Sequence, residues 1–587
     1  MQVKKIVVVG GVAGGASFIA RMRRLDEYAQ IILLERGPHI SFANCGLPYY
    51  VGGTIENRGA LLIQTPERMH DVFNVDIRVE NEVLFVDTNE KKVTVKNLQT
   101  GVTYQESYDY LVLAPGAQPI KPPIPGLAEA PVFTVRNVPD VDAIKNHLEQ
   151  HSARTAVVVG GGYIGLEMAD NLHALGLHVS IIEKAPQLIG TMDEDIAAIV
   201  AGHILSKGVH IYLNDGVDAF ENNGTNTEVL LESGKKVQGD IIILAIGVRP
   251  DVKFVKESGI ELGARGGIRV NAAMQTSAPA VYALGDAVEI EDFNSGTMTL
   301  IPLAGPANKQ GRLVADNIAG LNKRYNGTQG TAIAKVFDLT VAATGSSERS
   351  LQARNVVYST AITLPKSHAG YYPGALPLTI KTHFSPEGQI LGAQIVGYDG
   401  VAKSIDVLAT AVRLRQTVYD LQELELAYAP PFSSAKDPVN MVGFVAENML
   451  SDRMDTVYWH DISQLDLNKA MIVDVGEADE REMGLIENSS HIPLGHLRKR
   501  LNELPQDKEI IVYCQVGIRA YIATSILLQR GYQAKVLAGG YKHYASVINA
   551  LAALESQDYI FGNNEPVFVD VSKQDVYSSE TADTDTN

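Results

Sequence analysis

The chain has 587 residues, which is too long for one hydrophobic core and suggests about four folding units at roughly 150 residues each. Its 45% hydrophobic and 20% charged residues exclude fibrous and wholly disordered classes, and its net charge of −18 disfavours nucleic acid as a partner. No apolar run reaches the ~20 residues of a membrane-spanning helix, and no signal peptide is recognisable. We therefore predict a cytoplasmic protein without a membrane partner.

Residues 4–9 predict a buried parallel strand, which leads into a glycine-rich loop over 10–15 and a helix over 16–26. A second strand over 31–34 ends at Glu35, where a carboxylate can accept hydrogen bonds from ribose hydroxyls. Glycines in such a loop let backbone N–H groups approach a pyrophosphate. Taken alone, this loop fits a plain tight turn equally well. The candidate cofactor-binding residues here are Gly10, Gly14, Gly15 and Glu35.

The same pattern returns at residues 155–159, which precede the complete glycine spacing of residues 160–165, a helix and a strand over 179–182. Glu183 follows that strand and would repel a 2′-phosphate, which favours NADH over NADPH. Lys184 beside it weakens this inference, so NADPH stays an alternative. The candidate cofactor-binding residues here are Gly160, Gly162, Gly165 and Glu183.

Three further strands are predicted over 110–114, 241–245 and 281–284. The first two each run into a Gly-containing turn, the second of them with Gly247, and this repetition indicates an internal duplication. The third delivers Asp286, which could bind a flavin ribityl hydroxyl or could simply cap the next helix.

Residues 1 to about 450 resemble the flavin-dependent pyridine nucleotide disulfide oxidoreductases, because both loops, both strand-glycine repeats and Gly285-Asp286 occur in the right order. The resemblance implies an α/β protein that binds FAD and NADH and forms a homodimer. The domains it implies are FAD-binding at 1–149 and 246–324, NAD(H)-binding at 150–245, and an α+β dimerisation domain at 325–452.

Cys45 lies in a polar, turn-like segment and has no partner thiol nearby. A lone cysteine is usually a buried apolar residue, but the resembled fold brings this segment under the flavin ring. Cys45 must then exchange with an external sulfur, attacking a disulfide or persulfide to form a mixed disulfide.

The Cys45 segment is similar to that of coenzyme A disulfide reductases and also to that of NADH peroxidases and oxidases with a cysteine sulfenic acid. The peroxidases carry a histidine at the position of Ala13, which this chain lacks. Coenzyme A would require basic groups for its phosphates, which the first helix offers, although they also suit a solvated helix face. The substrate-binding residues that the resemblance implies are Arg21, Arg23, Ser41, Asn44, Gln64 and Arg68, with coenzyme A as substrate or bound ligand.

The region 325–452 contains predicted strands over 378–382 and 390–396 and a helix over 402–415. Its segments 368–373 and 427–432 resemble those that send two tyrosines to the cysteine of the partner subunit. We assign that role to Tyr371 and Tyr428, whose phenols could donate a hydrogen bond to a departing thiolate. Neighbouring Tyr372 competes for the first assignment, and both aromatic segments could instead only pack an interface.

Beyond residue 455 the pattern restarts, with predicted strands over 471–473, 510–513 and 534–537 and a helix over 519–529. Cys514 ends the second of these strands and opens a loop to a helix N-terminus, where backbone N–H groups and Arg519 would stabilise its thiolate. Residues 453–560 therefore resemble the rhodanese sulfurtransferases, although Gly476 stands where that family usually has an arginine. A phosphatase-like loop is the alternative, and residues 561–587 form a polar, acidic tail.

These features together predict an FAD-dependent, NADH-linked reductase of coenzyme A persulfide, polysulfide or disulfide. Cys45 and Cys514, with Tyr371, Tyr428 and Arg519, are its expected catalytic residues, the small-molecule sulfur compound is its expected partner, and no metal is expected. Cys514 would take up sulfane sulfur, and hydrosulfide would be released overall. The alternatives are an NADH oxidase or peroxidase that uses a sulfenic acid, and a sulfur carrier or redox-responsive protein.

Overall fold

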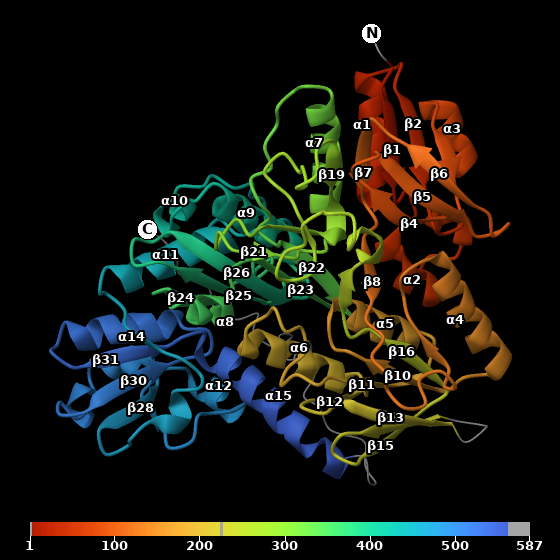
Figure 1. Cartoon of the computed structure of the whole chain (residues 1–587). Coiled ribbons are helices and arrows are strands. Elements are labelled where there is room, and N and C mark those ends of the chain that lie inside the picture. Colours follow the sequence, from red (N-terminus) through yellow and green to blue (C-terminus); the bar gives the residue numbers. More distant parts are fainter. Residues whose placement is uncertain (1–2, 223–226, 561–587) are drawn as a thin grey trace. The chain divides into compact units, whose positions relative to one another are not determined.

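The computed structural model describes residues 3–222 and 227–560, so the predicted tail at 561–587 lies outside the described residues (Figure 1). The chain divides into a first unit, Met1–Lys184 with Asn214–Gly330, and a second unit, Ala185–Leu213 with Thr331–Asn587. The finer domain boundaries taken from the sequence stay predictions. Within the described ranges, no helix combines the length and apolar character that a membrane span requires.

The first unit contains a parallel sheet with the strand order β19-β7-β1-β2-β3. Its strands are β1 (Lys5–Val9), β2 (Gln30–Leu34), β3 (Asp76–Arg78), β7 (Tyr110–Leu113) and β19 (Val281–Ala283). Helices α1 (Ala13–Leu25), α3 (Pro66–Phe73) and α7 (Ala304–Ile318) belong to the same fold. The strands predicted over 4–9, 31–34, 110–114 and 281–284 are thus confirmed to within a residue.

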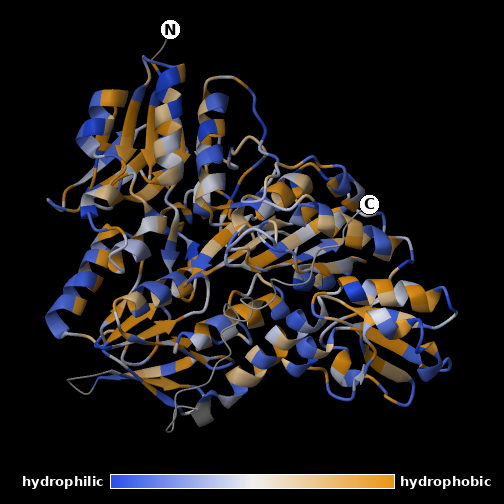
Figure 2. Ribbon diagram, turned by 180° about the vertical axis from the view of Figure 1, so that it is seen from behind, coloured by the Kyte–Doolittle hydropathy of each residue, from blue (hydrophilic) through white to orange (hydrophobic). Residues whose placement is uncertain are grey.

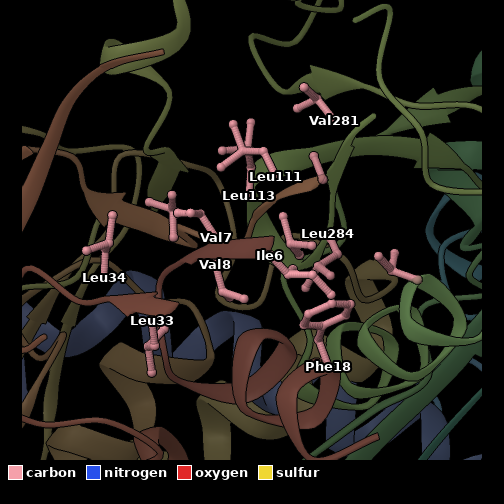
Figure 3. Packing of buried hydrophobic residues seen from close by; sticks show 14 of the residues in the cluster. Ile6, Val7, Val8, Phe18, Leu33, Leu34, Leu111, Leu113, Val281 and Leu284 are labelled. Carbon is pink, nitrogen blue, oxygen red and sulfur yellow. The ribbon is translucent and has the colours of Figure 1, made fainter. Parts of the chain in front are cut away.

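Burial on both faces explains why these strands are continuous apolar runs. Figure 3 shows strand residues such as Val8 and Leu113 in one cluster with Phe18 of α1 and with Leu284. Helix α1 begins earlier than predicted, so that Gly14 lies inside it. A Cβ at Gly14 would lie 2.2 Å from Leu284 Cδ1, and only glycine permits this close approach.

A second parallel sheet in this unit contains β11-β10-β16-β9 in that order. Its strands are β9 (Val132–Phe133), β10 (Thr155–Val159), β11 (His178–Ile182) and β16 (Ile241–Leu244), and its helices are α4 (Val138–His151) and α5 (Tyr163–Ala174). The predicted repeat of strand, glycine loop, helix and strand is therefore confirmed.

Each sheet is also accompanied by an antiparallel three-stranded meander, which the sequence analysis did not anticipate. The first consists of β4 (Asn81–Asp87), β5 (Lys92–Asn97) and β6 (Thr103–Ser107), and the second of β13 (Val217–Asn222), β14 (Thr227–Leu231) and β15 (Lys236–Gly239). Each meander directly precedes the strand that pairs with the first strand of its half, β7 with β1 or β16 with β10. The internal duplication thus extends beyond the glycine loops.

Shorter elements complete the first unit. They are α2 (Leu47–Val51), β8 (Ala117–Pro119), β17 (Val248–Pro250), β18 (Ile268–Arg269), β20 (Val288–Glu291) and β21 (Met298–Thr299).

The second unit contains an antiparallel sheet with the order β22-β23-β26-β25-β24. Its strands are β22 (Ala332–Val336), β23 (Leu339–Gly345), β24 (Ser359–Thr363), β25 (Leu378–Phe384) and β26 (Ile390–Gly397). Its helices are α8 (Glu348–Ala353), α9 (Val401–Arg413), α10 (Val418–Gln422) and α11 (Pro438–Leu450). The sheet is antiparallel and three of the four helices follow its last strand, as in the predicted α+β class.

The second unit also holds a parallel sheet with the order β27-β31-β30-β28-β29. Its strands are β27 (Thr456–Val457), β28 (Ala470–Asp474), β29 (Ser490–His491), β30 (Glu509–Tyr513) and β31 (Ala534–Leu537). Its helices are α12 (Ala478–Glu482), α13 (Leu494–Leu497), α14 (Ile518–Leu528) and α15 (Gly540–Ile560). In Figure 2 the strands of the sheets are mainly hydrophobic, whereas many helices alternate hydrophobic and hydrophilic residues.

Helix α15 packs along α6 (Glu194–Ser206), which comes from the segment Ala185–Leu213 together with β12 (His210–Tyr212) (Figure 1). Ala198 of α6 lies in one apolar cluster with Val547 and Ala550, against which Trp459 packs. A Cβ at Gly202 would lie 2.8 Å from the Cβ of Ala550, so glycine allows the two helices to approach closely.

A buried ionic cluster joins the start of α6 to β25 and to α15. Its members are Asp193, Asp195, Lys381, His383 and His543. The Lys381 ammonium lies 3.2 Å from Asp193 Oδ2 and 2.9 Å from Asp195 Oδ1. His383 Nε2 lies 2.8 Å from Asp193 Oδ2, and His543 Nε2 lies 3.1 Å from Asp195 Oδ2. One cation therefore bridges two buried carboxylates, each with its own histidine, and it also contacts the partly exposed Glu348 over 3.2 Å.

The cluster keeps both aspartates ionised. Burial alone would raise the pKa of Asp193, but the hydrogen bond with His383 and the charge of Lys381 lower it to about 2. The pKa of Asp195 is lowered in the same way by Lys381 and His543, against the effect of burial. Since an unfolded aspartate titrates near pH 3.9, the stabilisation is present above about pH 4 and is lost as the pH falls towards 2.

We expect Lys381→Met to lower the free energy of unfolding by about 3–5 kcal/mol, because it leaves two carboxylates buried without a cation. Urea unfolding followed by the fluorescence of Trp459, the one tryptophan of the chain, measures this loss near the cluster. Lys236→Met is the matched control, because Lys236 forms ion pairs with Glu221 and Glu228 at an exposed site. Equal midpoints for the two variants would contradict the role assigned to the cluster.

Candidate functional site

The first glycine loop has the shape of a pyrophosphate cradle. Gly10 has φ +94°, and a Cβ there would lie 2.1 Å from the carbonyl oxygen of Ala114. A Cβ at Gly15 would lie 1.9 Å from the carbonyl oxygen of Gly10. The N-cap residue of α1 is Val12, whose apolar side chain cannot accept a hydrogen bond from the first helical N–H groups. These N–H groups therefore suit an anionic ligand.

Two carboxylates flank this cradle. Glu35 accepts hydrogen bonds from the backbone N–H groups of Gly11 (2.9 Å) and Gly37 (2.7 Å), while burial raises its pKa. Asp286 lies in the turn after β19, and burial raises its pKa although Arg136 opposes this shift. Asp286 accepts no hydrogen bond from residues 3–222 or 227–560. It also does not cap α7, which starts at Ala304, so its carboxylate is available to a hydroxylated ligand such as the FAD ribityl chain.

The second loop repeats this geometry. Gly160 has φ +112° and a Cβ there would lie 2.4 Å from the carbonyl oxygen of Ala245, while a Cβ at Gly165 would lie 1.9 Å from the carbonyl oxygen of Gly160. Gly161 N–H donates to Glu183 Oε2 over 2.7 Å, as Gly11 does to Glu35. Gly162 is the N-cap residue of α5. The loop thus fits the pyrophosphate of a second dinucleotide, NADH.

Two more residues bear on that second loop. Gly247 follows β16 with φ +110°, which a residue with a side chain rarely adopts. Lys184, whose position beside Glu183 had weakened the case for NADH, forms an ion pair with Glu232 over 2.6 Å. That pairing reduces the attraction of Lys184 for a 2′-phosphate and supports the NADH preference.

Cys45 lies in a single helical turn, Asn44–Gly46, which leads into α2. Its thiol is free and accessible at the surface. Burial raises the pKa of this thiol, and the carboxylates of Glu167 and Asp286 raise it further. Helix α2 packs against α5, which carries Glu167. The lone thiol is thus held among acidic groups between the two nucleotide folds.

Three predicted substrate residues lie on adjoining backbone. The N–H group of Gln64 donates to the carbonyl oxygen of Ser41, and Asn44 follows on the same segment as Ser41. The side-chain oxygens Asn44 Oδ1 and Gln64 Oε1 are buried, and neither finds a hydrogen-bond partner among the described residues. Unpaired buried acceptors are costly, so these atoms indicate a polar ligand beside the thiol. Arg68, on α3, is exposed.

The two predicted helix arginines differ. Arg21 donates to Asp316 of α7 over 2.7 Å and keeps part of its side chain exposed. Arg23 is 6% exposed, and its guanidinium donates to the carbonyl oxygens of Phe73, Asp26, Glu27 and Asn74. The prediction that Arg23 binds a ligand is therefore wrong, because its donors hold α1 to α3 and to the following turn.

The second unit pairs the two predicted tyrosines. The hydroxyl groups of Tyr371 and Tyr428 lie 2.8 Å apart, and this hydrogen bond raises the pKa of Tyr371. Both side chains are exposed, at 71% and 46%. Tyr372 instead stacks edge-on against His368, with ring centroids 5.7 Å apart. Of the two neighbouring tyrosines, Tyr371 is thus the one that presents its hydroxyl together with Tyr428.

Cys514 lies directly after β30 and is 1% exposed. Gly517, which has φ +104°, donates its N–H to Cys514 Sγ over 3.2 Å. The start of α15 closes the loop, because Tyr541 N–H donates to the carbonyl oxygen of Cys514 over 2.8 Å. A Cβ at Gly540 would lie 2.6 Å from that same oxygen. The backbone of Gly517, Gly540 and Tyr541 therefore packs closely against Cys514.

Arg519, in the first turn of α14, donates to Glu480 Oε1 over 2.6 Å. Burial would lower the pKa of Arg519, but Glu480 and the attraction of Cys514 raise it. Nearby, Asp474 forms an ion pair with Arg481 over 3.2 Å. Gly476 occupies the position where the rhodanese family usually has an arginine. In this chain the guanidinium beside Asp474 comes from Arg481.

Family comparisons match these sites. The model of the pyridine nucleotide-disulphide oxidoreductases matches residues 4–311, more than half of the chain, and the dimerisation domain of that family matches residues 331–438. The chain belongs to the pyridine nucleotide-disulphide oxidoreductase family. A rhodanese-like domain matches residues 462–546. The family's cofactors are FAD and NAD(P)H, and the two cradles described above fit them.

Individual relatives show which members of the family this chain resembles. Coenzyme A disulfide reductase of Staphylococcus epidermidis is 36% identical over 445 residues, which are 76% of this chain and 100% of the relative. The crystal structure of reduced Bacillus anthracis CoADR-RHD has a TM-score of 0.91 and 51% identity, and covers 94% of this chain and 99% of that one. An NAD-dependent persulfide reductase from A. fulgidus has a TM-score of 0.87 and 35% identity, with coverages of 92% and 99%.

Sequence reasoning missed several residues of this oxidoreductase. Tyr49 donates to Glu167 over 3.4 Å, and burial together with Glu167 raises the pKa of Tyr49 to about 12. Glu167 lies two residues after the second glycine loop, and this position was the one sequence signal that could have identified it. Glu480 and Arg481 lie in a short acidic run, and the sequence pattern of that run is typical of an ordinary solvated helix face.

We expect Glu167→Gln to make Cys45 more reactive. Removing a neighbouring negative charge lowers the pKa of the thiol, so the thiolate fraction at neutral pH increases. Alkylation of Cys45 by iodoacetamide, measured on the FAD-loaded enzyme in a Cys514→Ser background, should accelerate about two- to fivefold. Glu149→Gln, at an exposed site on α4, is the control and should leave the rate unchanged. The same rate for Glu167→Gln and the parent would refute the electrostatic effect of Glu167.

Proposed function

We propose that the chain is an NADH-dependent flavoenzyme that reduces coenzyme A persulfide, polysulfide or coenzyme A disulfide through Cys45. The observation that carries the proposal is the lone thiol of Cys45 beside the unpaired buried acceptors of Asn44 and Gln64. A thiol without a partner thiol must form its disulfide with the substrate. The coenzyme A disulfide reductase and persulfide reductase relatives support this substrate class.

In the persulfide reaction, the Cys45 thiolate attacks the inner sulfur of the persulfide. A new S–S bond forms between Cys45 and the coenzyme A sulfur, the persulfide S–S bond breaks, and hydrosulfide leaves with the electron pair. Bound FAD would carry two electrons from NADH to this mixed disulfide. Addition of those electrons and one proton restores the Cys45 thiolate and releases the coenzyme A thiol. Asn44 and Gln64 would hold polar groups of the substrate during both stages.

The rhodanese-like domain would supply the persulfide. The Cys514 thiolate attacks the outer sulfur of a donor persulfide, and the donor leaves as a thiol that keeps the proton. The resulting Cys514 persulfide then passes its outer sulfur to coenzyme A. The Gly517 N–H group and Arg519 face the charged sulfur at this stage.

We further propose a homodimer and a cytoplasmic location. The matched dimerisation domain supports the dimer, in which Tyr371 and Tyr428 would present their paired hydroxyls to the partner's Cys45. A phenol that donates a hydrogen bond to a departing thiolate stabilises its charge.

An NADH oxidase is the second candidate, because a water-forming NADH oxidase from Lactobacillus brevis has a TM-score of 0.74 and 25% identity over 76% of this chain and 99% of that one. The first residue of α1 is Ala13, where the peroxidases that the Cys45 segment resembles carry a histidine. This chain therefore lacks that group for peroxide cleavage at the first loop, and the reductase is favoured.

Anaerobic NADH oxidation by the FAD-loaded enzyme tests the proposal, with coenzyme A persulfide, coenzyme A disulfide and hydrogen peroxide as oxidants. We expect turnover with hydrosulfide release from the persulfide, and a loss of at least about 10³-fold in Cys45→Ser, because the one other thiol of the chain, Cys514, belongs to the rhodanese-like domain and not to the flavin-binding fold. Cys514→Ser should keep activity with preformed coenzyme A persulfide but lose it when coenzyme A and another persulfide donor are supplied. Turnover with peroxide alone would overturn the reductase assignment.

A further inference from the structure

The Glu480 carboxylate connects the acidic helix α12 to the Cys514 loop. Its Oε1 accepts from Arg519 over 2.6 Å, and its Oε2 accepts from the N–H of Glu477 over 2.9 Å. The second contact belongs to a reciprocal capping box, in which the Glu477 side chain accepts from the N–H of Glu480. Both oxygens of Glu480 are therefore fixed, and Arg519, which is also attracted to Cys514, is hydrogen-bonded to the first of them.

The charges around the Cys514 loop are mostly negative. The acidic residues on and beside α12 are Glu477, Asp479, Glu480 and Glu482, and Asp474 lies at the end of β28. Of the two guanidinium groups at this site, Arg481 is paired with Asp474 and Arg519 with Glu480. His491 Nε2 lies 2.9 Å from the carbonyl oxygen of Gly476. The loop residues between Cys514 and Arg519 carry no charge. Both of these guanidinium groups are therefore paired with a carboxylate, and Lys542 is a further cation that adjoins the loop, through its N–H bond to the carbonyl oxygen of Gln515.

Known sulfane-sulfur donors differ in charge. Thiosulfate is a dianion and leaves as sulfite, which is also a dianion, when the Cys514 thiolate takes its outer sulfur. A protonated alkyl persulfide brings no charge to its outer sulfur and leaves as a neutral thiol once the proton has moved to it. Both reactions form one S–S bond at Cys514 and break one S–S bond in the donor. Only the reaction with thiosulfate brings three negative charges together at the site, one from the Cys514 thiolate and two from the donor.

We propose that Glu480 is a specificity-determining residue. It makes the Cys514 site disfavour dianionic donors such as thiosulfate and favour alkyl persulfides. It does so by engaging the one guanidinium that faces the Cys514 sulfur, which reduces the positive field available to a dianion. This inference rests on the proposed sulfur transfer by Cys514. It deepens that function by naming its donor class, and Glu480 acts through Arg519 without itself contacting the donor.

The test compares Glu480→Gln with Glu477→Gln in full-length, FAD-loaded protein that also carries Cys45→Ser. Glutamine at 480 keeps an oxygen acceptor for Arg519 but removes the charge. Glutamine at 477 removes the same charge from the same helix, and the hydrogen bond of Arg519 to Glu480 is untouched. Intact-mass spectrometry follows the addition of one sulfur atom to Cys514 from thiosulfate or from the persulfide of 2-mercaptoethanol, which carries no carboxylate.

We expect Glu480→Gln to raise the loading rate from thiosulfate about tenfold and that from 2-mercaptoethanol persulfide less than about threefold, because charge removal acts mainly on the dianion. Glu477→Gln should change either rate less than about twofold. Equal increases in the two variants, or no increase with thiosulfate in Glu480→Gln, would overturn the inference.

A second measurement separates this inference from the proposed function, because it needs no sulfur transfer. The ratio of the Cys514 alkylation rates with anionic iodoacetate and neutral iodoacetamide reports the local field directly. Glu480→Gln should raise this ratio about fivefold and Glu477→Gln less than about twofold. If the parent takes sulfur from neither donor, the proposed sulfur transfer fails. If donors load the parent but the alkylation ratio is the same in all three proteins, only the role of Glu480 fails.

Discussion

The buried bridge from Lys381 to Asp193 and Asp195 is the constraint on which the second unit depends. Two ionised carboxylates inside a protein are tolerated only with a cation and good hydrogen-bond geometry, and both are present here. The bridge fixes the start of α6 against β25, and through His543 it fixes α15 as well. Removal of Lys381 would leave both buried aspartates without the cation that they share.

The bridge also bears on sulfur chemistry, since α15 begins at the Cys514 loop. Tyr541 and Lys542 donate their N–H groups to the carbonyl oxygens of Cys514 and Gln515, and His543 is the next residue along the helix. The same helical turn that closes the loop is therefore anchored to Asp195. Because charges inside a protein allow few alternative geometries, the position of the loop is tied to the ionic cluster rather than to apolar packing alone.

The sequence predicted the parts of this molecule whose signals are local. The glycine at Gly10 is needed because a Cβ would overlap the carbonyl oxygen of Ala114, and such a requirement leaves a readable spacing. Buried parallel strands such as β10 must be apolar throughout, so their positions could be predicted to within one or two residues. The pairing of Tyr371 with Tyr428 came from a family resemblance, not from a residue pattern.

What could not be predicted depends on partners distant in the chain. Asp195 and Lys381 are separated by 186 positions, and neither stands out in its own segment. Arg23 was assigned to a ligand because coenzyme A phosphates require basic groups, whereas its actual acceptors are main-chain carbonyl groups, which have no sequence signature. Glu480 shows the same limit, since an acidic run on a short helix gives no hint that one of its members contacts Arg519.

The two thiols have different immediate partners, and this difference suits the two reactions proposed for them. Cys45 is near the carboxylates of Glu167 and Asp286, which together with burial raise its pKa and would also repel the hydrosulfide anion once it has formed. The Cys514 sulfur instead accepts a hydrogen bond from the Gly517 N–H group, and a neutral donor of this kind can hold a persulfide anion even where acidic side chains lie nearby. The thiol that must expel an anion thus has carboxylate neighbours, and the thiol that must retain one has a backbone donor.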